Sequence, residues 1–271
     1  MEFLFDDKKV YYEIYGEGKP LFVLNGIMMS HLSWKPFLSE MTKHSKVILF
    51  DFLDQGASAK LPDEVYTHDI QVALLHKLIE HLEFKTVDLL GISYGAQIAL
   101  QYAISYPDMV SKLLIFNAAS YTTPWLRDIG RAWIGAAKTY DPMHFFHVTI
   151  PYIYSNTFYT NNIKWIEERK ELLKLVFDRK FLDAMIRLIK SSEIFDVRDS
   201  LSKITANTLV VGSDCDYITP PDETKKLASG ISEAKYFELQ ECGHASMYER
   251  ANEFMTLVNG FITTSQSLKI V

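Results

Sequence analysis

Short apolar runs and longer amphipathic segments alternate along most of this chain. Runs rich in Val, Ile, Leu and Phe recur, and segments with apolar residues at helical spacing separate most of them. Such alternation is typical of a mostly parallel sheet whose strands are connected by helices. The runs that we expect to form buried strands are residues 21–24, 47–50, 87–90, 113–116, 208–211 and 236–239.

The amino-terminal segment has a different pattern. Residues 2–5 and 10–15 both carry strand-type residues, and the polar sequence Asp-Asp-Lys-Lys separates them. This arrangement predicts an antiparallel hairpin at one edge of the sheet.

Two segments have a clear helical pattern. The first covers residues 68–82, with Thr67 as its N-cap and Asp69 in its first turn. The second runs from Ser93 to about Tyr106 and ends before a proline, which cannot continue a helix. In the first helix the apolar stripe is expected to contain Ile70, Ala73, Leu74, Leu78 and Leu82.

The alternation of strands and helices stops after Asn117 and resumes at Thr208. Between residues 121 and 195 the pattern is helical and contains no convincing buried strand. We therefore predict an α/β core formed by residues 1–120 and 196–271, with residues 121–195 inserted as a helical lid. The inserted segment is rich in aromatic residues, including Trp125, Trp133, Phe145, Phe146, Tyr152, Tyr154, Phe158 and Tyr159.

The composition of the chain mainly excludes some classes of function. The 271 residues contain 28 Lys and Arg against 34 Asp and Glu, a formal net charge of −6, and 48% of them are hydrophobic. These values are ordinary for a globular domain, and an acidic chain argues against binding to nucleic acid. The first residues lack the regions of a signal peptide, and no apolar run approaches about 18 residues. We therefore expect a cytoplasmic protein with no membrane partner.

The pentapeptide Gly91-Ile92-Ser93-Tyr94-Gly95 introduces candidate chemistry, because it has the form G-x-S-x-G. A buried-strand run precedes it and a helical segment follows it. A strand that turns sharply into a helix holds the serine in a strained, exposed position, and the flanking glycines leave room for the turn. Ser93 is therefore the candidate nucleophile. The alternative is a glycine-flanked serine in an ordinary loop.

A serine hydroxyl needs a base to activate it and an acid to orient that base. His244 is the best-placed base, because it lies directly after a predicted strand and before the last helix. Asp214 and Asp216 both follow the preceding strand, and the residues alone leave open which of them orients the histidine. The remaining histidines have milder explanations as surface or lid residues, and these are His31, His44, His68, His76, His81, His144 and His147. We expect no metal site, because the last two have no further ligand at a usual spacing.

Together these features resemble the α/β-hydrolase fold family, and within it the compact lidded members similar to carboxylesterases, enol-lactonases and cofactor-free haloperoxidases. The resemblance covers nearly the whole chain. The family's order of serine, acid and histidine matches Ser93, Asp216 and His244. Its acid is usually followed by a proline four residues later, as Asp216 is by Pro220, which favours Asp216 over Asp214. The resemblance implies a mostly parallel eight-stranded sheet flanked by helices, with an inserted helical lid.

The same resemblance implies an oxyanion hole made by the backbone N–H groups of Ile27 and Tyr94. Two loops depart from the family's pattern. Asn25 stands where the family often has a histidine, and donation from the backbone tolerates this change. Leu53 and Asp54 replace the Arg and Gly of the usual D-x-R-G-x-G-x-S turn, which leaves the hydrogen bonds of that turn open.

The two cysteines are too few for a disulfide framework. If the triad is correct, Cys215 and Cys242 lie within two residues of a triad member and so on neighbouring loops. In a cytoplasmic protein we expect two free thiols, with a redox-sensitive bond as the alternative.

We therefore expect a carboxylesterase-like serine hydrolase that cleaves a small or medium, largely apolar ester, thioester or lactone through an acyl-enzyme, with no metal or cofactor. Its expected partner is a small-molecule substrate. The sequence leaves open whether the chain forms a homodimer. Fold and triad do not decide between this reaction and carbon–carbon bond hydrolysis or perhydrolysis. Outside enzymes, the alternative is a slow-turnover signalling or receptor protein. An acidic substrate would need an arginine in the pocket to bind its carboxylate. The inserted segment offers five candidates, which could equally be surface residues: Arg127, Arg131, Arg169, Arg179 and Arg187.

Overall fold

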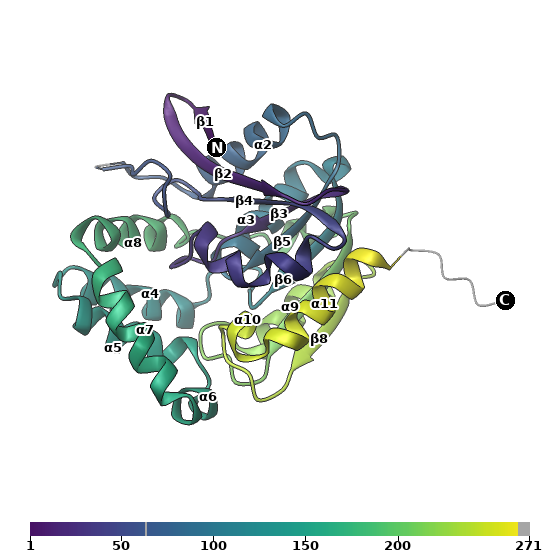
Figure 1. Cartoon of the computed structure of the whole chain (residues 1–271). Coiled ribbons are helices and arrows are strands. Elements are labelled where there is room, and N and C mark those ends of the chain that lie inside the picture. Colours follow the sequence, from purple (N-terminus) through teal and green to yellow (C-terminus); the bar gives the residue numbers. More distant parts are fainter. Residues whose placement is uncertain (63, 265–271) are drawn as a thin grey trace.

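The computed structural model describes residues 1–62 and 64–264, and in these residues eight strands form one sheet (Figure 1). The strand order is β1-β2-β4-β3-β5-β6-β7-β8. The pairs β1–β2 and β2–β4 are antiparallel and the other pairs are parallel, which confirms the predicted mostly parallel sheet with a hairpin at one edge. The strands are β1 (Glu2–Phe5), β2 (Lys8–Tyr15), β3 (Lys19–Leu24), β4 (Ser45–Phe50), β5 (Val87–Ile92), β6 (Val110–Phe116), β7 (Asn207–Ser213) and β8 (Lys235–Leu239).

The apolar runs of the central strands reflect burial on both faces. All six residues of β5 are buried, because helices cover the sheet on both sides. The edge strand β8 is different, since only Leu239 is buried in it. The expectation of a fully buried strand over residues 236–239 is therefore wrong for the other three positions. An edge strand has one neighbour and leaves side chains exposed to solvent.

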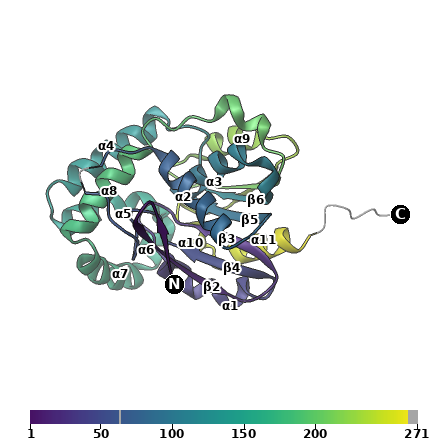
Figure 2. The same ribbon diagram turned by 90° about the horizontal axis from the view of Figure 1, so that it is seen from above.

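Two groups of helices and their cores sandwich the sheet (Figure 2). Helices α2, α3 and α9 pack on one face, and α1, α11 and the 3₁₀ helix η1 pack on the other. These elements, with the short α10, η2 and η3, are η1 (His31–Phe37), α1 (Leu38–Met41), α2 (His68–His81), α3 (Tyr94–Ser105), η2 (Pro107–Met109), η3 (Arg198–Lys203), α9 (Pro221–Gly230), α10 (Ser246–Glu249) and α11 (Ala251–Thr263).

Helix α2 begins as predicted, because the Thr67 side chain accepts a hydrogen bond from the backbone N–H of Asp69. The predicted apolar stripe needs one correction. Ala73 is exposed, whereas Val72 and Leu75 are buried against the sheet.

Five further helices lie between β6 and β7 in the chain, and they gather at one side of the sheet in both views (Figures 1 and 2). An isolated bridge between Tyr121 and Asp196 joins the two ends of the segment that contains these helices. Side chains of Thr123, Asp141 and Asp178 cap three of these helices. The inserted helices are α4 (Pro124–Ala137), α5 (Pro142–Ile153), α6 (Asn156–Asn161), α7 (Ile163–Val176) and α8 (Arg179–Ser191).

His68 is not the surface residue that the sequence indicated. It is buried at the start of α2, where its ring meets Tyr94 at 4.8 Å and Phe195 at 5.3 Å between ring centroids. Neither ring nitrogen has a hydrogen-bond partner within the described residues. Burial lowers the pKa of His68 to about 3. The neutral ring is therefore the form that the fold accommodates.

Replacing His68 by Phe is expected to make the protein more stable in acid. An unfolded histidine titrates near pH 6.5. Between that value and the lowered pKa of the folded state, the unfolded chain binds about one proton more, so the free energy of unfolding falls as the pH falls. The stability advantage of His68→Phe, measured by urea unfolding, should grow by about 2 kcal/mol from pH 7 to pH 5. The exposed His44 provides the control His44→Phe, and an advantage that does not change with pH would contradict the buried neutral ring.

Candidate active site

Ser93 lies in a strained turn at the end of the central strand β5. Its backbone has φ 53° and ψ −117°, a conformation that residues with a side chain rarely adopt. A Cβ atom at Gly91 would lie 2.7 Å from the Cα of Ala96, and one at Gly95 would lie 2.5 Å from the carbonyl carbon of Leu24. Glycine is therefore required on both sides of the serine, for the reason that the sequence motif indicated.

Three residues far apart in the sequence form one chain of hydrogen bonds. The Oγ atom of Ser93 lies 2.8 Å from Nε2 of His244, and Nδ1 of His244 lies 2.8 Å from Oδ2 of Asp216. An ionised carboxylate can only accept, so Nδ1 carries a proton, and a ring without a second proton leaves Nε2 free to accept from the serine. Strand β5 and the loops after β7 and β8 supply the three side chains.

Asp216 is fully enclosed by donors. Its carboxylate accepts from the backbone N–H groups of Ile218 at 2.8 Å and Thr219 at 2.9 Å, and from the Thr219 hydroxyl at 2.8 Å. Burial by itself raises the pKa of this carboxyl, but the charge and hydrogen bond of His244 and the bonds from Thr219 outweigh it and hold the pKa below its usual value. The acid is therefore ionised and positioned to orient the imidazole.

Asp214 has a different contact. Its Oδ1 atom accepts the backbone N–H of Cys242 at 3.0 Å, which ties the loop after β7 to the loop that carries His244. Of the two carboxylates that the sequence left open, only Asp216 reaches the histidine. Cys215 and Cys242 lie on these neighbouring loops, joined by a 2.9 Å backbone hydrogen bond, and both are free thiols.

Asn117 is a site residue that the sequence did not single out. It directly follows β6 with a φ of 49°, and its amide donates to Asp216 at 3.0 Å and to Ser213 at 2.9 Å. Its carbonyl oxygen accepts from Ser246 at 2.7 Å. Asn117 thus joins the ends of two strands to the helix after His244. The only signal in the sequence was a polar residue directly after a buried run.

The loop after β3 contains the predicted oxyanion donor Ile27. Ile27 and Tyr94, the second predicted donor, line the same cavity as Ser93 and His244. Asn25, which replaces the family's usual histidine, is fully buried and anchors the start of this loop. Its amide donates to the carbonyl of Phe50 at 3.0 Å and accepts from the Trp34 indole at 2.8 Å.

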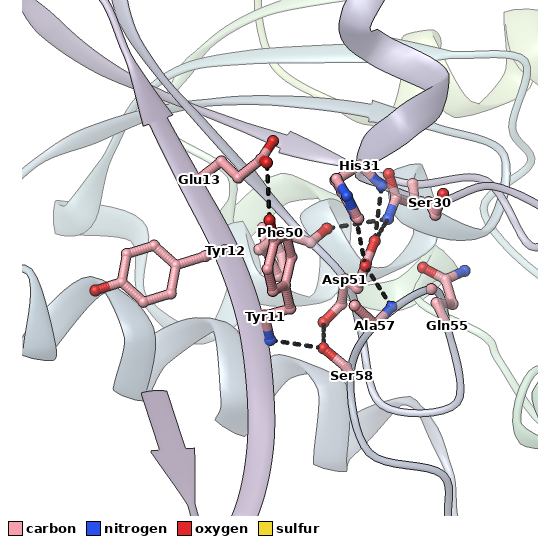
Figure 3. A network of polar contacts seen from close by, with 12 residues as sticks. Tyr11, Tyr12, Glu13, Ser30, His31, Phe50, Asp51, Gln55, Ala57 and Ser58 are labelled. Carbon is pink, nitrogen blue, oxygen red and sulfur yellow. Dashed lines mark hydrogen bonds and ion pairs between the residues drawn. The ribbon is translucent and has the colours of Figure 1, made fainter. Parts of the chain in front are cut away.

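A second buried histidine–aspartate pair holds the far end of this loop (Figure 3). Asp51 accepts both the backbone N–H and the ring Nδ1–H of His31, each at 2.7 Å. The same carboxylate accepts the backbone N–H of Ala57 at 2.8 Å. The sequence had placed His31 beside a surface helix, but the residue is buried and links the loop after β3 to the loop after β4.

The cavity above Ser93 is mainly apolar. The inserted helices supply most of its outer wall, through Ile129, Trp133, Ile150, Leu173 and Ile189. Its charged lining residues are Arg127, Arg169 and Glu193.

The five arginines of the inserted segment fall into distinct environments. Arg131 and Arg179 lie on the surface and pair with acids on their own helices. Arg187 is paired with Asp54. Arg127 and Arg169 line the cavity, so the structure narrows the candidates for an acid-binding residue to these two.

No group of three or more His, Cys, Asp or Glu side chains is arranged to hold a metal ion in residues 1–62 and 64–264. Within the same ranges, no helix combines the length and apolar character needed to cross a bilayer.

Comparisons with known proteins identify the family and the fold of this chain. Residues 21–256 match the sequence model of the alpha/beta hydrolase family. The solved structure of MGS-M2, an alpha/beta hydrolase enzyme from a Medee basin deep-sea metagenome library, is 44% identical, covers all of both chains and has a TM-score of 0.97. The enol-lactonase from Burkholderia xenovorans LB400 shares the fold at a TM-score of 0.86, with 20% identity over 97% of this chain and all of that one. A curated relative, 2-hydroxymuconate semialdehyde hydrolase of Pseudomonas sp. (strain CF600), is 26% identical over 94% of this chain and 90% of its own length.

The hydrogen-bond chain predicts a selectively reactive serine. A fluorophosphonate probe should label the protein at Ser93, and Ser93→Ala should abolish labelling, as read by mass spectrometry of the labelled peptide. Because Asp216 and not Asp214 reaches His244, Asp216→Asn should slow labelling by orders of magnitude, whereas Asp214→Asn should slow it far less. The reverse order of the two aspartate variants would show that the acid is misassigned.

Proposed function

The chain belongs to the alpha/beta hydrolase family, and from that premise we propose that it is a serine hydrolase which cleaves a small or medium, largely apolar carboxylic ester, thioester or lactone. Hydrolase activity follows from the family and its relatives. The ester-type substrate is our proposal. The observation that supports it best is the Ser93–His244–Asp216 chain of 2.8 Å contacts at the foot of an apolar cavity.

In the proposed mechanism Ser93 attacks the substrate carbonyl while His244 takes the hydroxyl proton at Nε2. The imidazolium that forms is stabilised by Asp216, whose carboxylate stays ionised. The tetrahedral intermediate collapses when His244 returns the proton to the leaving oxygen or sulfur, which leaves an acyl group on Ser93. A water molecule, deprotonated by His244, then releases the acid and restores the serine.

The developing oxyanion needs two donors that are already in place before the reaction. The resemblance assigns this role to the backbone N–H groups of Ile27 and Tyr94, and the position of both residues in the cavity wall supports it. Tyr94 also begins helix α3, so the positive end of the helix dipole adds to the stabilisation.

We further propose that residues 121–195 act as a lid over a core formed by residues 1–120 and 196–271. Apolar side chains from four inserted helices face the cavity, and removing water from it strengthens every electrostatic interaction inside. The lid is anchored beside the catalytic base, because Glu249 accepts from the Ser155 hydroxyl at 2.6 Å and from the Gly243 backbone N–H at 3.0 Å.

A series of p-nitrophenyl esters tests the ester proposal. If the acyl group enters an apolar cavity, each added CH₂ contributes roughly 0.8 kcal/mol, so kcat/KM should rise about fourfold per carbon from acetate to butyrate and fall once the cavity is full. Ser93→Ala should lose this turnover. A single burst of p-nitrophenol without steady-state turnover would instead indicate the slow-turnover receptor alternative.

One observation favours a second candidate reaction, carbon–carbon bond hydrolysis of a ketone that bears a carboxylate. The Arg169 guanidinium lies 5.0 Å from the ring centroids of both Trp165 and Tyr248, and its buried Nε has no hydrogen-bond partner within the described residues. No carboxylate of the described chain forms an ion pair with it. The name of the Pseudomonas relative specifies a muconate semialdehyde, which carries a carboxylate, as its substrate.

The two candidate functions predict opposite orders of reactivity for an acidic and an apolar ester. If Arg169 binds a substrate carboxylate, the p-nitrophenyl monoester of succinic acid should react faster than the butyrate ester, and Arg169→Met should reverse the order by lowering the acidic rate roughly ten- to hundredfold. Arg131→Met, on the surface of α4, is the matched control. A faster butyrate ester in the parent protein would leave the apolar ester as the preferred substrate.

A further inference from the structure

Helix α8 contacts the supports of both predicted oxyanion donors. Arg187 and Ser191 lie four residues apart, so they share one face of the helix. Arg187 reaches the loop after β4, which holds the loop of Ile27. Ser191 reaches the side chain of Tyr94. One helix of the inserted segment is thereby connected to both halves of the candidate oxyanion hole.

Arg187 forms a bidentate ion pair with a buried carboxylate. Its Nη2 atom donates to Oδ1 of Asp54 at 2.6 Å and its Nε to Oδ2 at 2.9 Å. The Asp54 side chain has no exposed surface, and the same carboxylate accepts from the backbone N–H of Leu61 and the hydroxyl of Tyr66. A buried carboxylate is tolerated only when a charged partner and further donors satisfy it, so this pair fixes α8 against the loop after β4.

Gln55, the residue after Asp54, connects this ion pair to the loop that carries Ile27. The side-chain nitrogen Nε2 of Gln55 donates to the carbonyl oxygen of Gly26 at 3.0 Å and to the carbonyl oxygen of Ile27 at 3.3 Å. Gln55 is almost fully buried, and Figure 3 shows it close to Ala57. The Gln55 side chain thus holds the two carbonyl groups that flank the Ile27 N–H. Its neighbour in the chain, Asp54, is paired with Arg187 of α8.

The contact of Ser191 has a defined direction. Its hydroxyl donates to the carbonyl of Leu188 at 2.7 Å, which uses its only proton. In the 3.0 Å contact between Ser191 and Tyr94 the tyrosine is therefore the donor and Ser191 the acceptor. Tyr94 is buried, so Ser191 supplies the partner that its hydroxyl needs and fixes the first residue of α3.

We propose that Arg187 and Ser191 are positioning residues that set the two oxyanion donors, so that the oxyanion hole is complete only while α8 is seated on the core. The proposal rests on the serine hydrolase function proposed above. Loss of one oxyanion donor costs about 10²–10³ in kcat, and a shift of about 1 Å costs about 10². Because these donors act on the transition state, unseating α8 lowers kcat more than it raises KM.

Asp54 offers a variant that removes the link without stranding a charge. Its φ of 69° lies in the left-handed region, which glycine adopts without strain, so Asp54→Gly keeps the turn. Combined with Arg187→Met, it removes both charges and leaves an apolar side chain of similar length. The second link is tested separately by Ser191→Ala and by Tyr94→Phe, which keeps the backbone N–H of Tyr94. Arg131→Met removes an exposed arginine from α4 and is the control.

For each variant, kcat and KM are measured on the best ester, together with the Kd of an alkyl boronic acid that forms a tetrahedral adduct with the serine. We expect the double variant and the Ser191 or Tyr94 variants each to lower kcat roughly ten- to hundredfold, to raise the Kd of the boronic acid by the same factor and to change KM less than about threefold. The control should match the parent protein.

Other outcomes overturn the proposal. Unchanged kcat in folded variants, or a loss confined to KM, would show that α8 only shapes the cavity. If the double variant does not fold, Ser191→Ala and Tyr94→Phe test the seating of α8 through the second link, because each removes only one hydroxyl, and an unchanged kcat in both overturns the proposal. A parent protein that neither turns over esters nor binds the boronic acid refutes the proposed function itself, and this result differs from an active parent whose variants are unaffected.

Discussion

The close approach of Gly95 to the end of β3 is the constraint on which the rest of the site depends. With no side chain at this position, helix α3 starts directly against the backbone of Leu24 and Asn25. That contact places the Ser93 turn beside the loop that carries Ile27. The candidate nucleophile, which follows β5, and the predicted oxyanion donors, which follow β3 and β5, can then line the same cavity. The strain at Ser93 is tolerated because β5 is buried at the centre of the sheet and its turn is held from both sides.

Much of this arrangement could be predicted from the sequence, because its signals are local. The run before Ser93 is apolar throughout, since a central parallel strand is buried on both faces, and the two glycines mark the turn that follows. Asp216 and His244 could be placed because each follows a strand, and the carboxyl ends of parallel strands meet at one edge of a sheet. The choice between the two aspartates and the assignment of Ile27 and Tyr94 as oxyanion donors needed the resemblance to a family.

The features that the sequence did not reveal depend on contacts between distant segments. Asp51 and His31 are 20 residues apart, and nothing in the surroundings of His31 distinguishes a buried pair from a surface histidine. Asn117 acts through a left-handed backbone that no local pattern encodes. The guanidinium of Arg169 faces a cavity that exists only once α7 has packed against the helices around it. Periodicity predicts which face of a helix is buried, but it does not identify the partner.

The ion pair of Asp54 and Arg187 joins residues that are 133 positions apart and lie on different sides of the insertion boundary. Recombination between members of the family at that boundary would separate them. A chimera that receives foreign inserted helices without a matching arginine would bury an unpaired carboxylate, at a cost of about 3–5 kcal/mol. That cost is a large share of the roughly 5–15 kcal/mol by which a folded protein is stable. In this chain the inserted helices are therefore not a freely exchangeable module, and a successful exchange has to carry residue 54 with them.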